Sequence, residues 1–236
     1  MCGRYRRTSQ EEELARMYHI PIPAQTDLPI SYNVAPSQNV LAVRYNPKNS
    51  ARSFVALRWG LIPSWAKDEK IGYKTINARM ESIQVAPSYR SAFEKRRCLI
   101  LANGFYEWRK TGGAKIPFDI ALPNDEPFAF AGLWEAWKNP ANQEWVLSCS
   151  IVTTEANELI RQIHDRMPVI LDTKDHPAWL GEERTNDLIH LLKPFPSDRL
   201  RMVEIGTRVN DPKNDDPSVL EPAPSLELWN RERSQR

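Results

Sequence analysis

The sequence is poor in the residues that build disulfide frameworks and metal sites. It has 3 cysteines and 4 histidines among 236 residues. A small, odd number of cysteines fits a reducing compartment better than a disulfide scaffold. No group of cysteines and histidines has the spacing of a zinc site, and the two nearest histidines are twelve residues apart. The sequence therefore predicts neither a metal nor another cofactor.

Long apolar runs and a strong excess of one charge are also missing. No apolar stretch approaches the roughly 18 residues that a membrane-spanning helix needs. The segment from Met1 to Thr8 lacks the apolar region of a signal peptide, so we expect a cytoplasmic protein. The net charge of +2 neither requires nor excludes an acidic partner, because a local basic cleft is enough to bind phosphates.

Glycine is scarce and proline is abundant, with 9 and 19 residues. Because proline fixes φ and removes a backbone donor, we expect short elements joined by stiff connections. A capping-box pattern at Ser9 predicts a helix over 9–19. Thr153 or Thr154 is the predicted N-cap of a helix over 155–164. Further helices are predicted over 87–95, 176–180 and 185–192.

Apolar alternation predicts strands over 40–43, 53–57, 97–101, 105–108, 116–122, 127–134, 144–152, 169–171 and 201–205. Asn103-Gly104 is a turn signal typical of a β-hairpin. Trp134 and Trp145 lie in strand patterns and are expected in the core. The order of elements predicts one α+β domain over 1–236, built around a mostly antiparallel, barrel-like sheet with short flanking helices. We expect 210–236 to be an extended C-terminal segment.

Cys2 offers chemistry that an interior cysteine lacks. Once Met1 is removed, residue 2 carries both a thiol and a free amine. The amine attacks an aldehyde to form an imine, and the thiol then closes a five-membered thiazolidine ring. An α-amino group has a pKa of about 7.7–8.0, so roughly a tenth of it is neutral and nucleophilic at pH 7. Cys98 and Cys149 lie in apolar stretches and are expected to be buried structural thiols.

Seven short motifs occur in order along nearly the whole chain. They are Met1-Cys2-Gly3-Arg4-Tyr5, Tyr32-Asn33-Val34-Ala35-Pro36, Arg58-Trp59-Gly60-Leu61-Ile62-Pro63-Ser64-Trp65, Ile76-Asn77-Ala78-Arg79-Met80-Glu81, Asn103-Gly104-Phe105-Tyr106-Glu107-Trp108, Ile163-His164-Asp165-Arg166-Met167-Pro168 and Val209-Asn210. With these motifs the sequence resembles the SRAP family, the "SOS-response-associated peptidase" proteins, which act on abasic sites through a terminal cysteine. The resemblance implies the SRAP fold and a part in DNA repair and the response to DNA damage.

The resemblance implies four catalytic positions, Cys2, Asn77, Glu107 and His164. Asn77 would orient the Cys2 amine or the sugar. Glu107 is the one acid in an aromatic and apolar stretch, and partial burial would raise its pKa and let it exchange protons with the amine. His164 would protonate the ring oxygen of the closed sugar and favour the open aldehyde. The roles of Glu107 and His164 could be exchanged without changing any feature of the sequence.

The implied substrate is an abasic site in single-stranded DNA or at a single-strand/double-strand junction. Guanidinium groups suit phosphates and aromatic rings suit unstacked bases. The predicted DNA-binding residues are Arg4, Asn33, Pro36, Trp65, Arg79, Trp108, Thr153 and Arg166. Trp59 is a further candidate stacking surface. We expect a monomer that associates with the nucleoid when it is bound to DNA.

Two other functions remain open at this stage. A thiol peptidase would use Cys2 as an N-terminal nucleophile, and removal of Met1 by the protein itself would be its natural reaction. Such an enzyme needs the thiol and an oxyanion hole, whereas a crosslinking protein needs the amine as well. A non-covalent single-strand binding module would show salt-sensitive binding that is independent of Cys2. Strand incision through the imine, a lyase activity, would accompany the crosslinking function in some family members.

Overall fold

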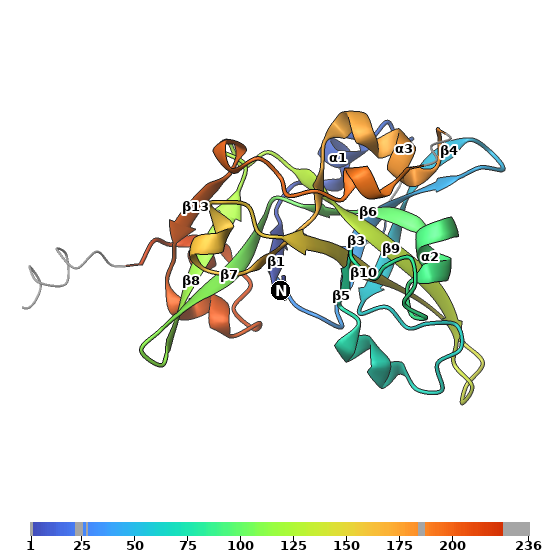
Figure 1. The fold of residues 1–236 in the computed structure, drawn as a ribbon, viewed down its shortest axis with the longest axis horizontal. Helices are drawn as coiled ribbons and strands as arrows, with labels where there is room; N and C mark the ends of the chain where they lie inside the picture. Colours follow the sequence, from blue (N-terminus) through green and yellow to red (C-terminus); the bar gives the residue numbers. More distant parts are fainter. Residues whose placement is uncertain (1, 22–25, 27, 184–186, 224–236) are drawn as a thin grey trace, which may run out of the picture.

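The computed structural model describes residues 2–21, 26, 28–183 and 187–223. Five strands close into a barrel in which each strand pairs with two neighbours (Figure 1). They are β3 (Asn39–Asn46), β4 (Ala51–Trp59), β6 (Arg97–Ala102), β9 (Phe128–Lys138) and β10 (Trp145–Glu155). The β10–β4 pairing is parallel, and the other four pairings of the barrel are antiparallel. The predicted α+β fold with a barrel-like sheet is confirmed.

Shorter strands extend the barrel, and a second sheet lies beside it. The extensions are β5 (Asn77–Arg79) and β11 (Arg166–Pro168) on β10, and β12 (Ile170–Leu171) on β9. The second sheet has the order β13 (Arg201–Glu204), β8 (Ala114–Ala121), β7 (Gly104–Thr111), β1 (Tyr5–Arg7), β2 (Ser31–Val34). All of its pairings are antiparallel, and β1 brings the amino-terminal segment to the middle of the molecule (Figure 1).

Alternate residues of the barrel strands face opposite sides, as the period of two in a strand requires. Val40 and Ala42 of β3 belong to an apolar cluster that draws on all five barrel strands and fills the barrel. Tyr5 of β1 joins this cluster, with its ring centroid 5.3 Å from that of Trp59. Cys98 and Cys149 are fully buried in the same cluster, which confirms that both are structural thiols.

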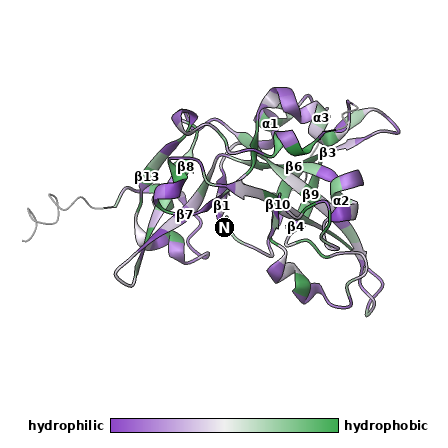
Figure 2. Cartoon of the chain, in the orientation of Figure 1, coloured by the Kyte–Doolittle hydropathy of each residue, from purple (hydrophilic) through white to green (hydrophobic). Residues whose placement is uncertain are grey.

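Three short α-helices cover the outer face of the barrel. They are α1 (Glu11–Met17), α2 (Arg90–Lys95) and α3 (His176–Leu180). Leu41 and Val43 of β3 join a second apolar cluster with residues of these helices. Figure 2 shows hydrophobic colour on the barrel strands and hydrophilic colour on much of α1 and α2. The remaining helical turns are 3-10 helices over Glu69–Lys74, Ile160–Gln162, Thr173–Asp175, Ile189–Leu191, Ser197–Arg199, Thr207–Asn210 and Pro217–Leu220.

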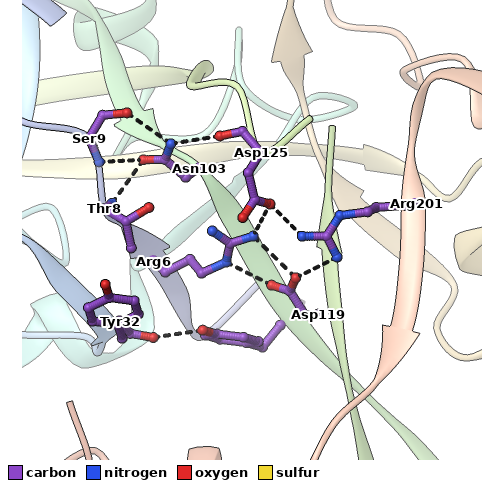
Figure 3. Close-up of polar contacts among 9 residues, drawn as sticks. Arg6, Thr8, Ser9, Tyr32, Asn103, Asp119, Asp125 and Arg201 are labelled. Atoms are coloured by element: carbon purple, nitrogen blue, oxygen red, sulfur yellow. Dashed lines mark hydrogen bonds and ion pairs between the residues drawn. The ribbon is translucent and has the colours of Figure 1, made fainter. Parts of the chain in front are cut away.

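The segment around Asn103 and Gly104 crosses between the two sheets, so the hairpin prediction is wrong. β6 pairs within the barrel, whereas β7 pairs with β1 and β8. The Asn103 side chain accepts hydrogen bonds from the backbone amides of Thr8 and Ser9 at 2.9 and 3.0 Å (Figure 3). Asn103 Nδ2 donates to the Ser9 hydroxyl and to the Asp125 carbonyl. The turn residues thus tie β1 to the crossover instead of closing a hairpin.

A buried ion-pair network lies beside this crossover. Arg6 is fully buried, and its guanidinium contacts Asp119 at 2.9 Å and Asp125 at 2.8 Å. Arg201 of β13 binds the same two carboxylates from the other side (Figure 3). Because Arg6 and Asp119 are desolvated, removal of either would leave the other as an uncompensated buried charge. The network fixes β1 against β8 and β13.

Four local predictions are also wrong. Ser9 does not cap α1, because its hydroxyl accepts from Asn103 and the N-cap residue is Gln10. Thr153 and Thr154 lie within β10, which pairs with β11, so 155–164 forms a 3-10 turn in place of a helix. Trp145 is 66% exposed and lies outside the core, whereas Trp134 is partly buried against the barrel cluster.

The carboxyl-terminal segment is less extended than predicted. Two 3-10 helices, Thr207–Asn210 and Pro217–Leu220, lie at its start and middle, and Val219 is fully buried. Residues 224–236, and positions 185 and 186 of the predicted helix over 185–192, lie outside the described residues, and the described part of that helix contains the 3-10 turn Ile189–Leu191. In the described part of the chain, no helix has the length and apolar character needed to cross a membrane.

Candidate active site

Cys2 lies three residues before β1, inside the protein. Its side chain is fully buried and packs with Tyr5 in the cluster that fills the barrel. The Sγ atom is 3.9 Å from the carbonyl oxygen of Arg4. Burial raises the pKa of the Cys2 thiol well above its ordinary value, and the negative charge of Glu107 raises it further. At neutral pH the side chain is therefore a thiol, and its reaction needs a proton acceptor.

Asn77 begins β5, which pairs in parallel with β10. Its Nδ2 atom donates a 2.8 Å hydrogen bond to the carbonyl oxygen of Cys2. The Asn77 carbonyl accepts a hydrogen bond from the Tyr89 hydroxyl at 2.9 Å, which fixes the backbone at this point. Asn77 Oδ1 is buried and has no hydrogen-bond partner among the described residues. The amide thus holds Cys2 in place and keeps one acceptor for another donor.

Glu107 and His164 complete the group. Glu107 lies on β7, two residues beyond the position that pairs with Tyr5, and it is 4% exposed. Burial raises the pKa of Glu107, while neighbouring positive charge, including that of His164, opposes this shift. The electrostatic influence of Glu107 on Cys2, and of His164 on Glu107, places the three side chains together. The structure thus brings all four predicted catalytic residues to one site.

His164 follows the 3-10 helix Ile160–Gln162. Its Nδ1 atom accepts a 3.0 Å hydrogen bond from the backbone amide of Arg166. The same nitrogen lies 3.0 Å from the exposed carboxylate of Asp165. In the neutral ring the acceptor role of Nδ1 assigns the proton to Nε2, whereas a protonated ring would donate from Nδ1 to Asp165. The site therefore accommodates both protonation states that acid–base chemistry requires.

An open pocket of about 530 Å³ reaches two of these residues, Glu107 and His164. It is lined by Arg4, Glu107, Trp108, Lys110, Lys115, His164 and Asn210. Sequence reasoning missed Lys110 and Lys115, and it gave Asn210 no role. Asn210 accepts a 2.7 Å hydrogen bond from the Trp108 indole. The pair of glycines between the two lysines, Gly112 and Gly113, was the signal for a hairpin that places both on one surface.

Arg4 is held at the pocket by protein groups. Its guanidinium donates 2.8 Å hydrogen bonds to Asn33 Oδ1 and to the Val209 carbonyl. Burial lowers the pKa of Arg4. Asn33 is itself 1% exposed, and its Nδ2 atom donates to the carbonyl oxygens of Val209, Asp211 and Asn214. Asn33 thus has a structural role in positioning Arg4, and its contact with DNA stays a prediction.

The other predicted DNA-binding residues differ in how far they reach the surface. Trp65 is 57% exposed, Arg79 is exposed, and Pro36 is partly exposed in a turn. Arg166 binds Glu81 through both carboxylate oxygens and the Thr153 carbonyl at 2.7 Å. Thr153 is fully buried. Trp59 is also fully buried and donates to the Ile76 carbonyl, so its prediction as a stacking surface is wrong.

The family model for SOS response associated peptidase (SRAP) matches residues 1–212. The chain belongs to this family. The abasic site processing protein YoqW of Bacillus subtilis is 43% identical over 94% of this chain and 99% of its own length. The abasic site processing protein HMCES of Xenopus tropicalis is 32% identical over 80% of this chain and 65% of its own length. A crystal structure of a Bacteroides thetaiotaomicron protein has a TM-score of 0.84 at 27% identity, covering 94% of this chain and all of the other.

The relatives agree with the architecture described above, since the matching structure covers both the barrel and the second sheet. The family match extends from the amino-terminal segment to residue 212, so all four candidate catalytic residues lie within it. Within the described residues, no three His, Cys, Asp or Glu side chains form a group that could hold a metal ion.

Proposed function

We propose that this protein recognises abasic sites in single-stranded DNA and links to them covalently through Cys2 after removal of Met1. The single observation that carries this proposal is the grouping of Cys2 and Asn77 with Glu107 and His164, the last two of which line an open pocket. Support comes also from the relatives, whose names describe abasic site processing. The domain is proposed to act as a monomer in DNA repair.

The chemistry begins with the open-chain aldehyde of the abasic sugar. Removal of Met1 frees the amine of Cys2, which attacks the aldehyde carbon and forms a carbinolamine. Loss of water gives an imine. The Cys2 thiol adds to the imine carbon, its proton passes to the imine nitrogen, and a thiazolidine ring closes. The product has the mass of both reactants minus one water.

Glu107 and His164 supply the proton transfers in this proposal. Glu107 is buried beside Cys2 with a raised pKa, so it accepts a proton from the amine and later from the thiol. His164 is partly exposed at the pocket and donates from Nε2 to the oxygen of the closed sugar, which opens the ring. Asn77 fixes the Cys2 carbonyl, which orients the amine toward the pocket.

The imine is also the intermediate from which β-elimination would cut the DNA strand. Ring closure by the thiol removes the imine and protects the strand. We therefore expect strand cleavage to increase when the thiol is absent and the amine is retained. Cys2→Ala, which keeps the amine and has no group that can close the ring, is the variant in which this lyase activity should be highest, and Cys2→Ser, whose hydroxyl closes the ring less readily than the thiol, should be intermediate.

The thiol peptidase remains the competing proposal. A thiolate nucleophile is favoured by a lowered pKa, whereas burial raises the pKa of Cys2 here. The hydrogen bond from Asn77 falls on the carbonyl of Cys2 itself, which orients this residue but does not polarise the bond that precedes it. These two observations favour crosslinking over hydrolysis. They leave removal of Met1 to an aminopeptidase or to the protein itself.

Intact-mass spectrometry tests the proposal directly. The protein is mixed with an oligonucleotide that carries one abasic site, after removal of Met1 has been verified. We expect an adduct equal to the trimmed protein plus DNA minus one water, stable to heat and absent with Cys2→Ala. Chemical acetylation of the Cys2 amine should abolish the adduct. An adduct formed by the acetylated protein, or none formed by the trimmed protein, would defeat the proposal and favour the peptidase.

A further inference from the structure

The tip of the β7–β8 hairpin carries two lysines that have no role in the chemistry above. Lys110 of β7 pairs directly with Lys115 of β8. The turn between them contains Gly112 and Gly113 with φ of 55° and 87°, the conformation of a tight two-residue hairpin loop. Both lysines are exposed and both line the pocket that contains Glu107 and His164. Directly opposed like charges destabilise a strand pair, and a bound anion would offset the repulsion between these two lysines.

The opposite face of the same hairpin gives an internal comparison. Arg109 lies there, 3.5 Å from the carboxylate of Glu204, and its guanidinium stacks over the ring of Phe118 at 5.1 Å. That cation is neutralised within the protein. Neither Lys110 nor Lys115 has an ion-pair partner among the residues that the structure describes. Among the described residues, the positive charge of the hairpin that has no intramolecular partner therefore lies on Lys110 and Lys115, which line the pocket.

We propose that Lys110 and Lys115 bind the phosphodiester backbone of the nucleic-acid strand next to the reacting nucleotide. This inference rests on the proposed function, because it extends the path of the strand from the pocket onto the hairpin. Lysine suits this task as a flexible point charge that contacts phosphate without reading sequence. Trp108, on the same face of β7 as Lys110, provides an aromatic surface between the lysines and the catalytic residues.

The affinity of a single-stranded oligonucleotide tests this proposal. The probe carries a tetrahydrofuran abasic analogue, which has no aldehyde and cannot crosslink, so binding is measured alone. The test variant is Lys110→Ala/Lys115→Ala. The control variant is Lys48→Ala/Lys138→Ala, which removes the same charge from exposed positions at the β3–β4 turn and the end of β9.

We expect the hairpin variant to bind several-fold more weakly at low salt, and the control variant to bind like the unmodified protein. Each phosphate contact adds about 0.7 to the slope of log affinity against log salt for a single strand, so loss of both should make the slope shallower by about 1.4. Equal slopes for the two variants would overturn the proposal. Lys110→Arg/Lys115→Arg should restore the slope, because the charges are retained.

A second probe series locates the contact. Oligonucleotides with single neutral methylphosphonates on either side of the lesion should weaken binding of the unmodified protein at one or two positions. At those positions the hairpin variant should lose nothing further. Additive losses at every position would contradict a direct contact. At saturating concentration the hairpin variant should still crosslink a true abasic site. Failure of the unmodified protein to crosslink would count against the proposed function, independently of the role of the two lysines.

Discussion

At the scale of single residues, burial sets the protonation of the site. Cys2 and Glu107 are both removed from water, and burial raises the pKa of each. The neutral thiol and a carboxyl group that gains a proton more readily than an ordinary glutamate lie side by side. Such a pair is poor at generating thiolate but good at passing protons, which is what successive steps of imine and ring formation require.

Glu107→Gln should slow crosslinking without destabilising the fold at neutral pH. General acid–base groups contribute about 10²–10⁴-fold to rate, so we expect a loss of crosslinking rate of that order, measured by denaturing gel electrophoresis. Below the raised pKa of Glu107 the unmodified protein should also slow, because the protonated acid accepts no proton. The part of the acid limb that Glu107 causes should vanish in the variant, whereas the fall in rate caused by protonation of the Cys2 amine should remain. Identical acid limbs in the two proteins would show that Glu107 does not contribute to the limb.

The stability of Glu107→Gln should change in the opposite direction. A carboxyl whose pKa is raised on folding contributes stability below its unfolded pKa, and this is lost as pH rises through the folded pKa. The glutamine variant has no such loss. Its free energy of unfolding relative to the unmodified protein should therefore increase from pH 4 to pH 8, as measured by urea denaturation. A difference in free energy of unfolding that is independent of pH would mean that folding does not raise the pKa of Glu107.

Trp59 and Trp65 lie six positions apart in one motif, but Trp59 is fully buried and Trp65 is 57% exposed. Trp59→Ala should lower the free energy of unfolding by about 3–5 kcal/mol, because it empties part of the barrel. Trp65→Ala should leave stability nearly unchanged and weaken single-strand binding by about 1–3 kcal/mol if its ring stacks on a base. Thermal unfolding and fluorescence anisotropy measure the two effects. Unchanged binding would remove Trp65 from the DNA-binding set.

At the scale of elements, the crossover at Gly104 depends on close packing. A Cβ atom there would lie 2.7 Å from Arg6 Nε, within the buried ion-pair network. Gly104→Ala should therefore displace the Arg6 guanidinium and destabilise the protein by about 3–5 kcal/mol, as loss of a buried charge partner does. Gly206→Ala is the matched control, because its nearest atom would be 3.7 Å away. Similar melting temperatures for the two variants would show that the network tolerates the shift.

Local sequence patterns predicted most strands because alternation reports directly which face is buried, as in β3 and β6. These patterns failed where tertiary contacts impose a different conformation on the same residues. Asn103 has a turn-forming side chain, but its four hydrogen bonds with Thr8, Ser9 and Asp125 hold it in a crossover. The segment 155–164 has helical spacing, yet pairing of β10 with β11 extends the strand into it.

In the candidate site too, local motifs predicted some features and tertiary structure determined the others. The motifs supplied the four candidate catalytic positions, because each lies in a stretch that resembles the family. The exposure of each aromatic residue was not readable from those motifs, so Trp59 was misplaced. Lys110 and Lys115 lie outside every motif, and it is the β7–β8 register that sets them opposite each other at the pocket.

At the scale of the whole molecule, the carboxyl-terminal segment holds the site together. Asn33 donates to three carbonyls of residues 209–214, and Arg4 donates to one of them. Asn33→Ala should leave these acceptors without their donor and lower the free energy of unfolding by about 2–4 kcal/mol. Limited proteolysis should then cut near residues 207–220 before the barrel. If Asn33→Ala resisted proteolysis as well as the unmodified protein does, the predicted DNA contact would be the main role of Asn33.

The burial of Cys2 also limits the time during which Met1 is accessible for removal. β1 forms its sheet by pairing with Gly104 and Phe105, about one hundred residues later in the chain. At roughly 5–20 residues per second, a ribosome needs on the order of 5–20 s to supply that partner. An aminopeptidase needs an accessible chain end, and this interval provides one before the barrel and second sheet enclose Cys2. If an aminopeptidase removes Met1, we therefore expect it to act during synthesis, before folding encloses Cys2.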